Sequence, residues 1–549
     1  MSDSERELAR LRDDVIGEGA CIATPFGSRR VTYADHIASG RSLASVEDSL
    51  RAAVLPLYAN THTEDSATGA ITTRLAHDAA AYIKRCLGAD ESYKLLFPGT
   101  GATGALKRLQ EILGVSVPEE LRDGLLRSLA PAERLVVLVG PYEHHSNELS
   151  WRESLAEVIT VPLDGDGLID LAALEALLGD ARFASRRKLG SFSAASNVTG
   201  LLTDVRAVAS LLHAHDAVAV FDYAASAPYV DIDVGPSNEG VKDWLDAVVL
   251  SPHKFLGGPG SPGLLLLHQS LYQRVRPTTA GGGTVSYVSH TQHRYYDDIE
   301  LREDAGTPAI VQKVRAAMAF RVKERVSHGF IARREHELIT HAFERLAATT
   351  GVRVLGNLNA PRLAVISFLV DAGGKPLHAK FVVRLLSDLF GVQARAGCSC
   401  AGPYGHDLLG IDEETSSCFL HAVEAGYEGV KPGWARVSFH YLIDDAERDY
   451  LLDAIEFIAG NGHKFLPQYQ FDWHSGAWRH VSEVQEAPSQ SFEADDWRPV
   501  ERSNRPRADD YAAYLAEARE LAGDPAAEPR NDSDQVPAGL DERVLWFAR

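Results

Sequence analysis

The sequence of 549 residues contains little cysteine and fewer basic than acidic side chains. Its five cysteines, at positions 21, 86, 398, 400 and 418, form an odd and sparse set, which argues against a disulfide framework and indicates a reducing compartment. Lysine and arginine total 55 against 76 aspartate and glutamate residues, which gives a net charge of −21. Because such a charge repels polyanions, we expect neither nucleic acid nor an anionic membrane surface to be a general partner.

Long apolar runs are also missing. No run in the sequence approaches the roughly 18 to 20 apolar residues that cross a bilayer. Residues 1–15, MSDSERELARLRDDV, are charged and contain no apolar core of a signal peptide. We therefore expect a cytoplasmic protein that does not associate with membranes.

Seven short apolar runs between about residues 90 and 270 alternate with segments of helical periodicity. The apolar residues in these runs follow one another without alternating with polar residues, as in strands that are covered on both faces. This pattern predicts an α/β fold with a mainly parallel seven-stranded sheet, in which ligands bind beyond the carboxyl ends of the strands. Residues 202–216 have the periodicity of a crossover helix. The runs are 93–97, 134–140, 156–163, 188–196, 217–224, 245–251 and 263–268.

The pattern changes near residue 308. A long helical segment at 309–329 leads into a mixture of strand-like and helical runs, which is typical of an α+β domain. The end of the chain is rich in Pro, Asp and Glu and contains four of the seven tryptophans, so we expect it to pack in places and to be loose in others. The predicted parts are an N-terminal segment at 1–50, a large α/β domain at 51–307, a smaller α+β domain at 308–462 and a C-terminal extension at 463–549.

Residues 97–109, FPGTGATGALKRL, form a glycine-rich turn between a predicted strand and a predicted helix. Backbone amides at such a helix N-terminus are suited to cradle a phosphate. The glycine spacing also matches G-x-G-x-x-G, but a dinucleotide site needs a second strand that ends in an acidic residue about 20 residues on. Residues 115–124, VSVPEELRDG, do not resemble a strand. We therefore favour a phosphate site, with a plain tight turn as the alternative.

Two charged residues follow apolar strands directly. Lys254 lies just after a predicted buried strand, at the start of a loop that is rich in glycine and proline. Partial desolvation there favours the neutral amine that forms a Schiff base, whereas a solvated surface cation is the alternative. Asp222 ends another strand, where its burial requires a cationic partner such as a protonated pyridine nitrogen. A helix cap or an ion pair within the fold is the alternative for this carboxylate.

Histidine and asparagine follow two further strands. His144 and His145 come after the run at 134–140, where an imidazole can stack on a flat cofactor, shuttle a proton or be purely structural. Asn197 ends the run at 188–196 and offers a neutral donor for a ring oxygen, with an Asx-turn as the alternative. Together these strand-end residues suit one flat, phosphorylated pyridine aldehyde, pyridoxal 5′-phosphate (PLP).

The order of these motifs resembles the class V aminotransferase family of fold-type I PLP enzymes. Within that family, the sequence is most similar to the SufS-type cysteine desulfurases and selenocysteine lyases. The resemblance extends from about residue 30 to about residue 460 and implies the PLP-dependent transferase fold. The motifs that carry it are GTGATG, EHHSN, SNVTG, FDYAA, SPHK, GGGTV, AGTP, RAGCSCAGP and RVSF.

The resemblance implies a role for each candidate site residue. Lys254 would form the Schiff base, Asp222 would pair with the pyridine nitrogen, and His144 would stack on the ring and handle protons. The PLP phosphate would be bound by Gly101, Ala102, Thr103, Ser251 and His253, and Asn197 would contact the ring hydroxyl or the substrate carboxylate. Thr284 would reach the phosphate of a neighbouring subunit, which implies a homodimer. Arg395 and Arg436 would bind the substrate carboxylate.

The resemblance further implies cleavage of a C–S bond in a cysteine-like amino acid, with Cys400 as the acceptor that becomes a persulfide and passes its sulfur to an acceptor protein. The sequence departs from the family at Ala225, where a Gln is usual, and in a longer loop at 254–263. A class V aminotransferase, epimerase or C–S lyase that does not use Cys400 is therefore the alternative.

Cys398 stands two positions before Cys400 in the sequence RAGCSCAGPYGHDLLG. It would pack in the fold or act as an auxiliary thiol that receives or resolves a persulfide. A non-catalytic protein that holds a metal through both cysteines is the least favoured alternative, because structural zinc sites use C-x-x-C pairs. We therefore predict no metal site.

Overall fold

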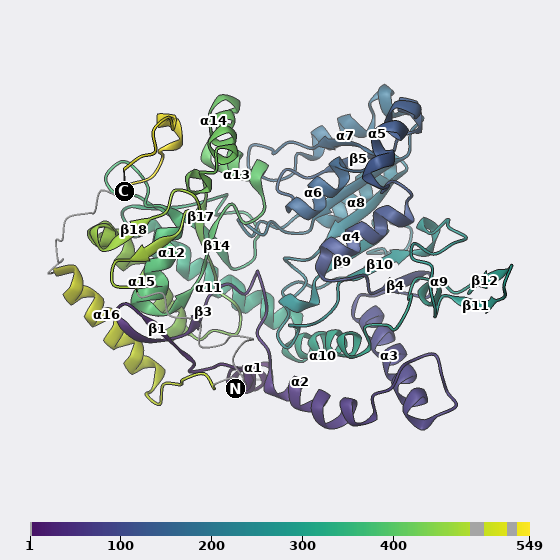
Figure 1. Cartoon of the computed structure of the whole chain (residues 1–549), viewed down its shortest axis with the longest axis horizontal. Coiled ribbons are helices and arrows are strands. Elements are labelled where there is room, and N and C mark those ends of the chain that lie inside the picture. The colour runs from purple at the N-terminus through teal and green to yellow at the C-terminus, as the bar shows by residue number, and fades with distance from the viewer. Residues whose placement is uncertain (1–2, 484–498, 524–534, 549) are drawn as a thin grey trace.

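The computed structural model describes residues 3–483, 499–523 and 535–548. Figure 1 shows two lobes side by side, one built around a seven-stranded sheet and the other around a four-stranded sheet. Among the described residues, no helix is both long enough and apolar enough to cross a membrane.

The seven-stranded sheet forms from the seven predicted runs. Its strands follow the order β4-β10-β9-β8-β7-β5-β6, and only β10 runs antiparallel to its neighbours. The predicted α/β fold with a mainly parallel sheet is therefore confirmed. The strands are β4 (Tyr93–Leu96), β5 (Val136–Val139), β6 (Glu157–Thr160), β7 (Lys188–Ser193), β8 (Ala217–Asp222), β9 (Ala247–Leu250) and β10 (Leu264–His268).

Helices cover both faces of this sheet, which explains why its strands are continuously apolar. In β5, Val137 and Val139 pack against α4 and α6, whereas Leu138 belongs to the core on the other face. The helices on the first face are α4 (Gly101–Ile112) and α6 (His145–Arg152), and those on the second face are α3 (Ala67–Cys86), α7 (Leu171–Leu178), α8 (Val205–Ala214) and α10 (Ile310–Val326). The exposed helix α5 (Glu119–Ser128) follows α4.

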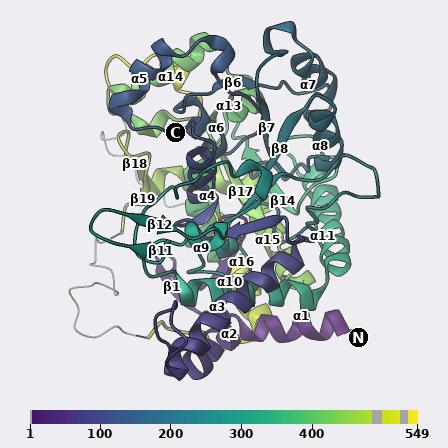
Figure 2. The same cartoon turned by 90° about the vertical axis from the view of Figure 1, so that its right-hand side faces the viewer.

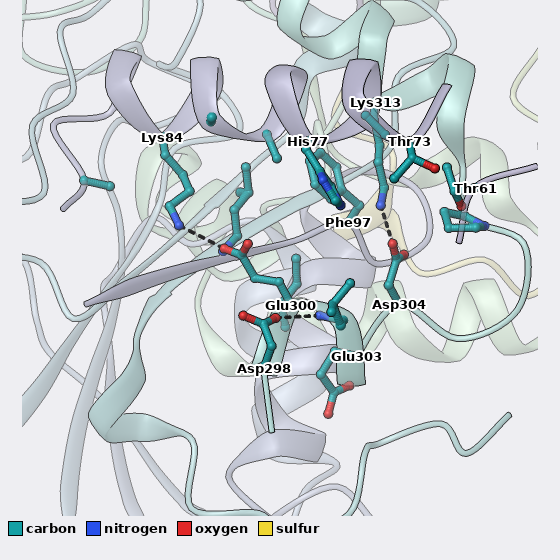
Figure 3. Close-up of a pocket in the computed structure, with 18 of the residues that line it drawn as sticks. Thr61, Thr73, His77, Lys84, Phe97, Asp298, Glu300, Glu303, Asp304 and Lys313 are labelled. Carbon is teal, nitrogen blue, oxygen red and sulfur yellow. Dashed lines mark hydrogen bonds and ion pairs between the residues drawn. The ribbon is translucent and has the colours of Figure 1, made fainter. Parts of the chain in front are cut away.

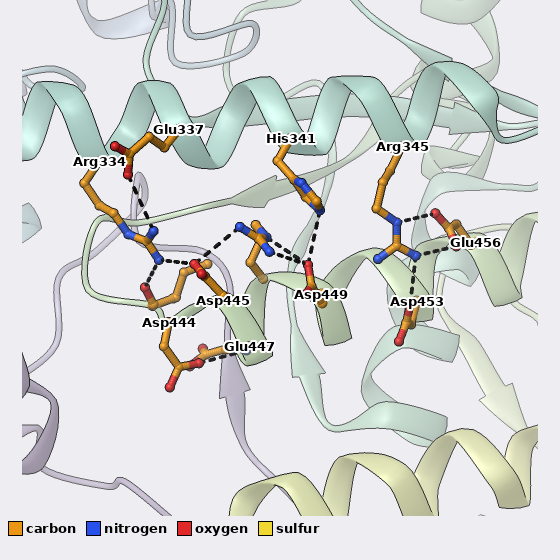
Figure 4. A network of polar contacts seen from close by, with 12 residues as sticks. Arg334, Glu337, His341, Arg345, Asp444, Asp445, Glu447, Asp449, Asp453 and Glu456 are labelled. Carbon is orange, nitrogen blue, oxygen red and sulfur yellow. Dashed lines mark hydrogen bonds and ion pairs between the residues drawn. The ribbon is translucent and has the colours of Figure 1, made fainter.

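The smaller lobe contains an antiparallel sheet in the order β13-β14-β17-β16, packed against three helices. Ion pairs join two of these helices: Arg345 bonds to Asp453 at 2.8 Å and to Glu456 at 2.6 Å (Figure 4). The elements are β13 (Val352–Val354), β14 (Val365–Val370), β16 (Arg395–Gly397), β17 (Trp434–Ser438), α11 (His328–Ala348), α12 (Ala379–Phe390) and α15 (Asp445–Asn461).

The helix predicted at 309–329 is interrupted near its end. α10 ends at Val326, and Ser327 adopts a positive φ of 74° before α11 begins at His328. A residue with positive φ cannot continue a right-handed α-helix, so the chain changes direction there. Two consecutive helices therefore replace the single predicted segment and connect the two lobes.

The two ends of the chain pack together on the smaller lobe. Arg30 of β2 bonds to Asp510 of α16 at 2.9 Å, and both side chains are buried. The domain boundaries remain predictions, and of the C-terminal extension expected at 463–549, residues 484–498 and 524–534 lie outside the described residues. The terminal elements are α1 (Asp3–Asp14), β1 (Cys21–Thr24), β2 (Gly27–Arg30), β3 (Thr32–Tyr33), α2 (Ala44–Ser49), β18 (Tyr469–Phe471), β19 (Trp478–His480) and α16 (Arg507–Gly523).

Three further segments complete the fold around the sheets. A hairpin of β11 (Val285–Val288) and β12 (His293–Tyr295) projects from the large lobe (Figure 2). After β16, the chain forms α13 (Gly402–Leu409) and α14 (Glu413–Glu424). The short helix α9 (Ile299–Arg302) follows the hairpin and contacts β4.

Candidate active site

One cavity of about 300 Å³ lies where β8 and β9 end and the two lobes meet. Its position agrees with the rule that α/β sheets bind ligands beyond the carboxyl ends of their strands. The predicted site residues that line it are Gly101, Ala102, Thr103, His144, Asn197, Asp222, Ser251, His253, Lys254, Arg395, Cys400 and Arg436. The structure thus brings together every predicted site residue except Thr284.

The N-terminus of α4 forms a cradle on one side of the cavity. Gly101 has a positive φ of 62°, and a Cβ at this position would lie 3.3 Å from Ser251 Oγ. The amide of Ala102 donates to Ser251 Oγ at 2.8 Å, and the hydroxyls of Thr103 and Ser146 lie 2.7 Å apart. Hydroxyls beside the first amides of a helix are suited to bind a phosphate.

The long loop at 254–263 packs tightly under this cradle. The amide of Gly263 donates to Gly99 O at 3.1 Å, and a Cβ on Gly263 would lie only 2.1 Å from Gly101 O. The end of this loop therefore supports the glycine-rich turn. The other departure, Ala225, lines the cavity with a methyl group and offers no hydrogen bond from its side chain.

Lys254 and Asp222 are desolvated together. Burial raises the pKa of Asp222, whose carboxylate accepts from the amide of Ala224 at 2.8 Å. Burial also lowers the pKa of Lys254 to about 8, although the charge of Asp222 opposes this shift. An amine with so low a pKa is partly neutral near physiological pH and can act as a nucleophile or a base.

The two histidines after β5 have different surroundings. His144 caps α6 by accepting from the amide of Ser146 at 3.1 Å, and burial lowers its pKa to about 4, so its ring is neutral. His145 instead holds the cysteine loop: its amide donates to Cys400 O at 2.8 Å, and its Nε2 accepts from the amide of Gly402 at 2.9 Å. His145 therefore positions Cys400, a role that the sequence did not indicate.

Arg395 and Arg436 converge on one carboxylate that the sequence interpretation missed. Arg395 Nε donates to Asp35 Oδ2 at 2.9 Å, and Arg436 Nη2 donates to Asp35 Oδ1 at 3.0 Å. Arg436 also donates to Asn197 O at 2.8 Å. Asp35 lies in the segment 31–40 that the resemblance included, but no sequence spacing links it to arginines that lie 360 and 401 residues further along the chain.

The backbone around Cys400 is unusual. Ser399 and Cys400 both have positive φ, 52° and 58°, a conformation that residues other than glycine rarely adopt. Asn197 Nδ2 donates to Ser399 O at 2.7 Å and helps to hold this turn, while Asn197 Oδ1 is buried without a partner in the described part of the chain. The Cys400 side chain is exposed into the cavity that Lys254 also lines.

A buried carboxylate behind the cavity was also missed. Glu143 accepts from the amide of Ser193 at 2.8 Å, from its hydroxyl at 2.6 Å and from Asn147 Nδ2 at 2.6 Å. Burial raises the pKa of Glu143 to about 7. These bonds tie the end of β7 to the segment that carries His144, so Glu143 fixes the geometry of the site.

Thr284 lies outside the cavity. Its hydroxyl donates to Gly281 O at 2.7 Å, and the residue is fully buried at the base of the β11–β12 hairpin. Its predicted contact with a neighbouring subunit remains a prediction. Within the ranges that the structure describes, no cluster of three or more His, Cys, Asp or Glu side chains could hold a metal ion.

A second cavity, of about 550 Å³, lies between α3, β4 and α9 (Figure 3). Its lysines face carboxylates: Lys84 lies 3.0 Å from Glu300, and Lys313 lies 2.5 Å from Asp304. None of the predicted site residues lines it. This cavity was not predicted from the sequence, because its walls come from separate segments.

The fold and the active-site cavity together define a PLP-dependent enzyme of fold type I. The chain belongs to the class V aminotransferase family, because the family model described as Aminotransferase class-V matches residues 32–451. The predicted family, enzyme class and cofactor are thus confirmed.

Individual proteins similar to this chain carry the name cysteine desulfurase. A probable cysteine desulfurase of Staphylococcus aureus (strain COL) is 26% identical over 395 residues, which cover 71% of this chain and 88% of the relative. A probable cysteine desulfurase of Halobacterium salinarum is 30% identical over 299 residues, which cover 54% of this chain and 67% of the relative.

Solved structures agree on the fold. The apo cysteine desulfurase of Thermococcus onnurineus NA1 superposes with a TM-score of 0.64 at 23% identity, covering 82% of this chain and 98% of the other. The cysteine desulfurase CsdA of Escherichia coli has a TM-score of 0.61 at 21% identity, covering 82% of this chain and 97% of the other.

Proposed function

We propose that the protein is a cysteine desulfurase, which releases alanine from L-cysteine and leaves the sulfur on Cys400 as a persulfide. The observation that carries this proposal is that the exposed thiol of Cys400 lines the same cavity as the predicted PLP-binding pair of Lys254 and Asp222. Relatives named cysteine desulfurase support it.

The residues of the cavity fit PLP. The cradle at Gly101 has room that a Cβ would fill, the Asn197 Oδ1 atom lacks a partner among the described residues, and Lys254 offers an amine whose pKa is lowered. When bound, PLP supplies an electron sink that stabilises negative charge at the substrate Cα. The phosphate would be held by Gly101, Ala102, Thr103, Ser251 and His253, and the ring by His144, Asn197 and Asp222.

The arginine pair binds the α-carboxylate of the substrate in this proposal. Within the described residues, Arg395 uses only Nε for Asp35, which leaves its terminal nitrogens for a bidentate contact. About half of the Arg395 side chain is exposed, so a substrate reaches it without breaking the fold. Arg436 is buried, and its bonds to Asp35 and Asn197 O fix the second donor.

Lys254 and Cys400 act on the bound substrate. The neutral amine of Lys254 removes the α-proton, which its lowered pKa favours near neutral pH. Cys400 Sγ, as the thiolate, then attacks the substrate sulfur: a new S–S bond forms and the Cβ–S bond breaks. The electron pair of the broken bond stays with the substrate Cβ, which takes up a proton, and the α-proton held by Lys254 returns to Cα before alanine leaves. No external oxidant or reductant is needed for this step.

We also propose a cytoplasmic homodimer that passes its sulfur to an acceptor protein. The projecting β11–β12 hairpin exposes Tyr287 and Val288 and carries Thr284 at its base, which supports contact with a second copy. The five cysteines are free thiols, which agrees with a reducing compartment. The exposed position of Cys400 supports transfer of its sulfur to another protein.

The test is a Cys400→Ala variant loaded with PLP. We expect the wild-type protein to form alanine and protein-bound sulfur in equal amounts from L-cysteine. The variant should keep the visible absorbance of bound PLP and lose at least about 100-fold in alanine formation, because the attacking sulfur is gone. Cys418→Ala is the matched control and should behave as wild type, since Cys418 lies on α14 outside the cavity.

Two outcomes contradict the proposal. Sulfide and pyruvate formed by Cys400→Ala at the wild-type rate identify a C–S lyase that does not need Cys400. Transfer of the amino group of L-cysteine or another amino acid to an oxo acid, with no sulfur on the protein, identifies an aminotransferase.

A further inference from the structure

Cys398 and Cys400 lie on the same loop but line different cavities. Cys400 lines the active-site cavity, whereas Cys398 lines a separate groove of about 260 Å³ between α13 and α14. The two cavities share no lining residue. The loop therefore separates the active-site cavity from the groove, and one of its two cysteines lines each of them. The apolar part of the groove wall consists of Leu409, Phe419, Leu420, Val423, Pro432 and Trp434.

We propose that Cys398 is a second sulfur carrier, which takes the sulfane sulfur from Cys400 and holds it on the groove side of the loop. This inference rests on the proposed function, since it requires a persulfide on Cys400. It adds a covalent modification site at Cys398, with the sulfane sulfur of L-cysteine as the group it receives.

The loop geometry keeps the two thiols within reach of each other. Residues i and i+2 have Cα atoms at most about 7 Å apart even in an extended chain. Here the consecutive positive φ angles of Ser399 and Cys400 turn the chain, and the amide of Ala401 donates back to Cys398 O at 3.0 Å. Such a turn lets side-chain rotation bring the two sulfur atoms into contact.

Hydrogen bonds from the active site fix this turn. Asn197 Nδ2 binds Ser399 O at 2.7 Å, and the amide of His145 binds Cys400 O at 2.8 Å. On the groove side, the amide of Gly402 is held by His145 Nε2 at 2.9 Å. The loop is thus held from the large lobe on both sides of Cys400, and the thiols move by rotation rather than by opening of the loop.

The groove is suited to shelter a persulfide. Cys398 is partly buried, and most of the groove surface around it is apolar. Trp434 forms part of the wall, is fully buried, and its indole Nε1 has no hydrogen-bond acceptor among the described residues.

The transfer is a thiol exchange that balances without another reactant. The thiolate of Cys398 attacks the outer sulfur of the Cys400 persulfide, and a new S–S bond forms at Cys398. The S–S bond at Cys400 breaks, and its electron pair remains on Cys400 Sγ, which takes up a proton at equilibrium. Cys400 is then free to react with a second molecule of L-cysteine while the first sulfur remains on Cys398.

The amount of alanine in the first burst tests this relay. The PLP-loaded protein is mixed with L-cysteine and no acceptor protein, and the alanine formed before the slow steady state is measured. We expect about two alanines per chain for wild type and about one for Cys398→Ser, because only the relay lets Cys400 react twice. Cys418→Ser, which removes another free thiol, should keep the wild-type burst.

Mass spectrometry of the alkylated loop peptide locates the sulfur after a single equivalent of L-cysteine. We expect the extra sulfur on Cys398 in wild type and on Cys400 in Cys398→Ser. Cys398→Ala serves as a second variant, and retained PLP absorbance shows that each variant folds. Equal bursts in wild type and Cys398→Ser, or a Cys398–Cys400 disulfide with free sulfide, would overturn the relay. A wild-type burst from Cys400→Ser would overturn the proposed function instead.

Discussion

The active-site cavity and the cavity beside α3 hold their lysines in opposite ways. In the larger cavity, Lys84 and Lys313 each lie within 3.0 Å of a carboxylate (Figure 3). In the active-site cavity, Lys254 has no ion-pair partner within hydrogen-bonding distance in the described part of the chain, and burial lowers its pKa to about 8. The two lysines of the larger cavity are thus paired with carboxylates, whereas the lysine of the active-site cavity is not paired with any among the described residues.

This difference shows why volume is a poor guide to the reactive site. A lysine that is paired with a carboxylate is held in its charged form and stabilises the fold. A lysine that is desolvated without such a bond keeps a reactive neutral form, and the cost of its burial is offset elsewhere in the structure. Asn197 Oδ1 lines the same cavity as Lys254 and is likewise buried without a hydrogen-bond partner among the described residues.

Removing the unpaired lysine gives the largest expected effect. Lys254→Ala should lower the rate of alanine formation from L-cysteine by at least about 1,000-fold, because it removes the amine that moves the α-proton. The measurement is the initial rate with PLP in excess. If the variant forms alanine at more than a small fraction of the wild-type rate, Lys254 does not move the α-proton, and the difference between the two cavities has no catalytic meaning.

The lowered pKa of Lys254 predicts how PLP uptake depends on pH. The amine must be neutral to react with the aldehyde, and its neutral fraction grows as pH rises toward the pKa of about 8. The rate of PLP uptake by the PLP-free protein should therefore rise about 50-fold between pH 6 and pH 8, rise about twofold more by pH 9, and then level off. Stopped-flow absorbance measures this rate. A rise that continues beyond pH 9 would mean that Lys254 is an ordinary solvated lysine.

Substituting Asp35, the carboxylate that bonds to both arginines, tests whether it positions them to bind the substrate. Asp35→Asn removes the charge that Arg395 and Arg436 share. We expect KM for L-cysteine to rise about tenfold with a smaller change in kcat, since the arginines lose their fixed positions. Steady-state kinetics measure both constants, with the exposed Asp48→Asn as the control. An unchanged KM would show that Asp35 does not position the arginines.

The smallest effect is expected in the larger cavity. Lys84→Met breaks the partly exposed pair with Glu300 and should lower the free energy of unfolding by about 1 kcal/mol. Alanine formation should stay within about twofold of wild type, because no active-site residue lines this cavity. Chemical denaturation and initial rates measure the two quantities. A loss of activity without a loss of stability would assign this cavity a part in the reaction.

The sequence was a good guide wherever the signal was local. The apolar runs that became β7, β8 and β9 predicted strand ends, and the residues just after them, such as Asp222 and Lys254, meet in one cavity. This follows from the geometry of parallel sheets, whose strands end at a common edge. The resemblance added the arginines and Cys400 from the smaller lobe, which local patterns alone would not have joined to that edge.

What depends on distant contacts was not predictable. Asp35 acquires its role only when the fold brings it to Arg395 and Arg436, and His145 acquires its role only when the loop of Cys400 crosses it. The separation of Cys398 from Cys400 into two cavities likewise depends on the backbone conformation of one turn. The sequence shows that the two cysteines are close together, but it does not indicate that they line different cavities.

The most direct test of the central claim is the mass of the loop peptide after one turnover. The Cys398→Ser variant, loaded with PLP and mixed with one equivalent of L-cysteine, keeps any sulfur on the thiol that first receives it. We expect Cys400 to be heavier by one sulfur atom, with alanine formed in equal amount. Alanine, pyruvate or sulfide formed while Cys400 carries no sulfur would contradict a desulfurase that works through this cysteine.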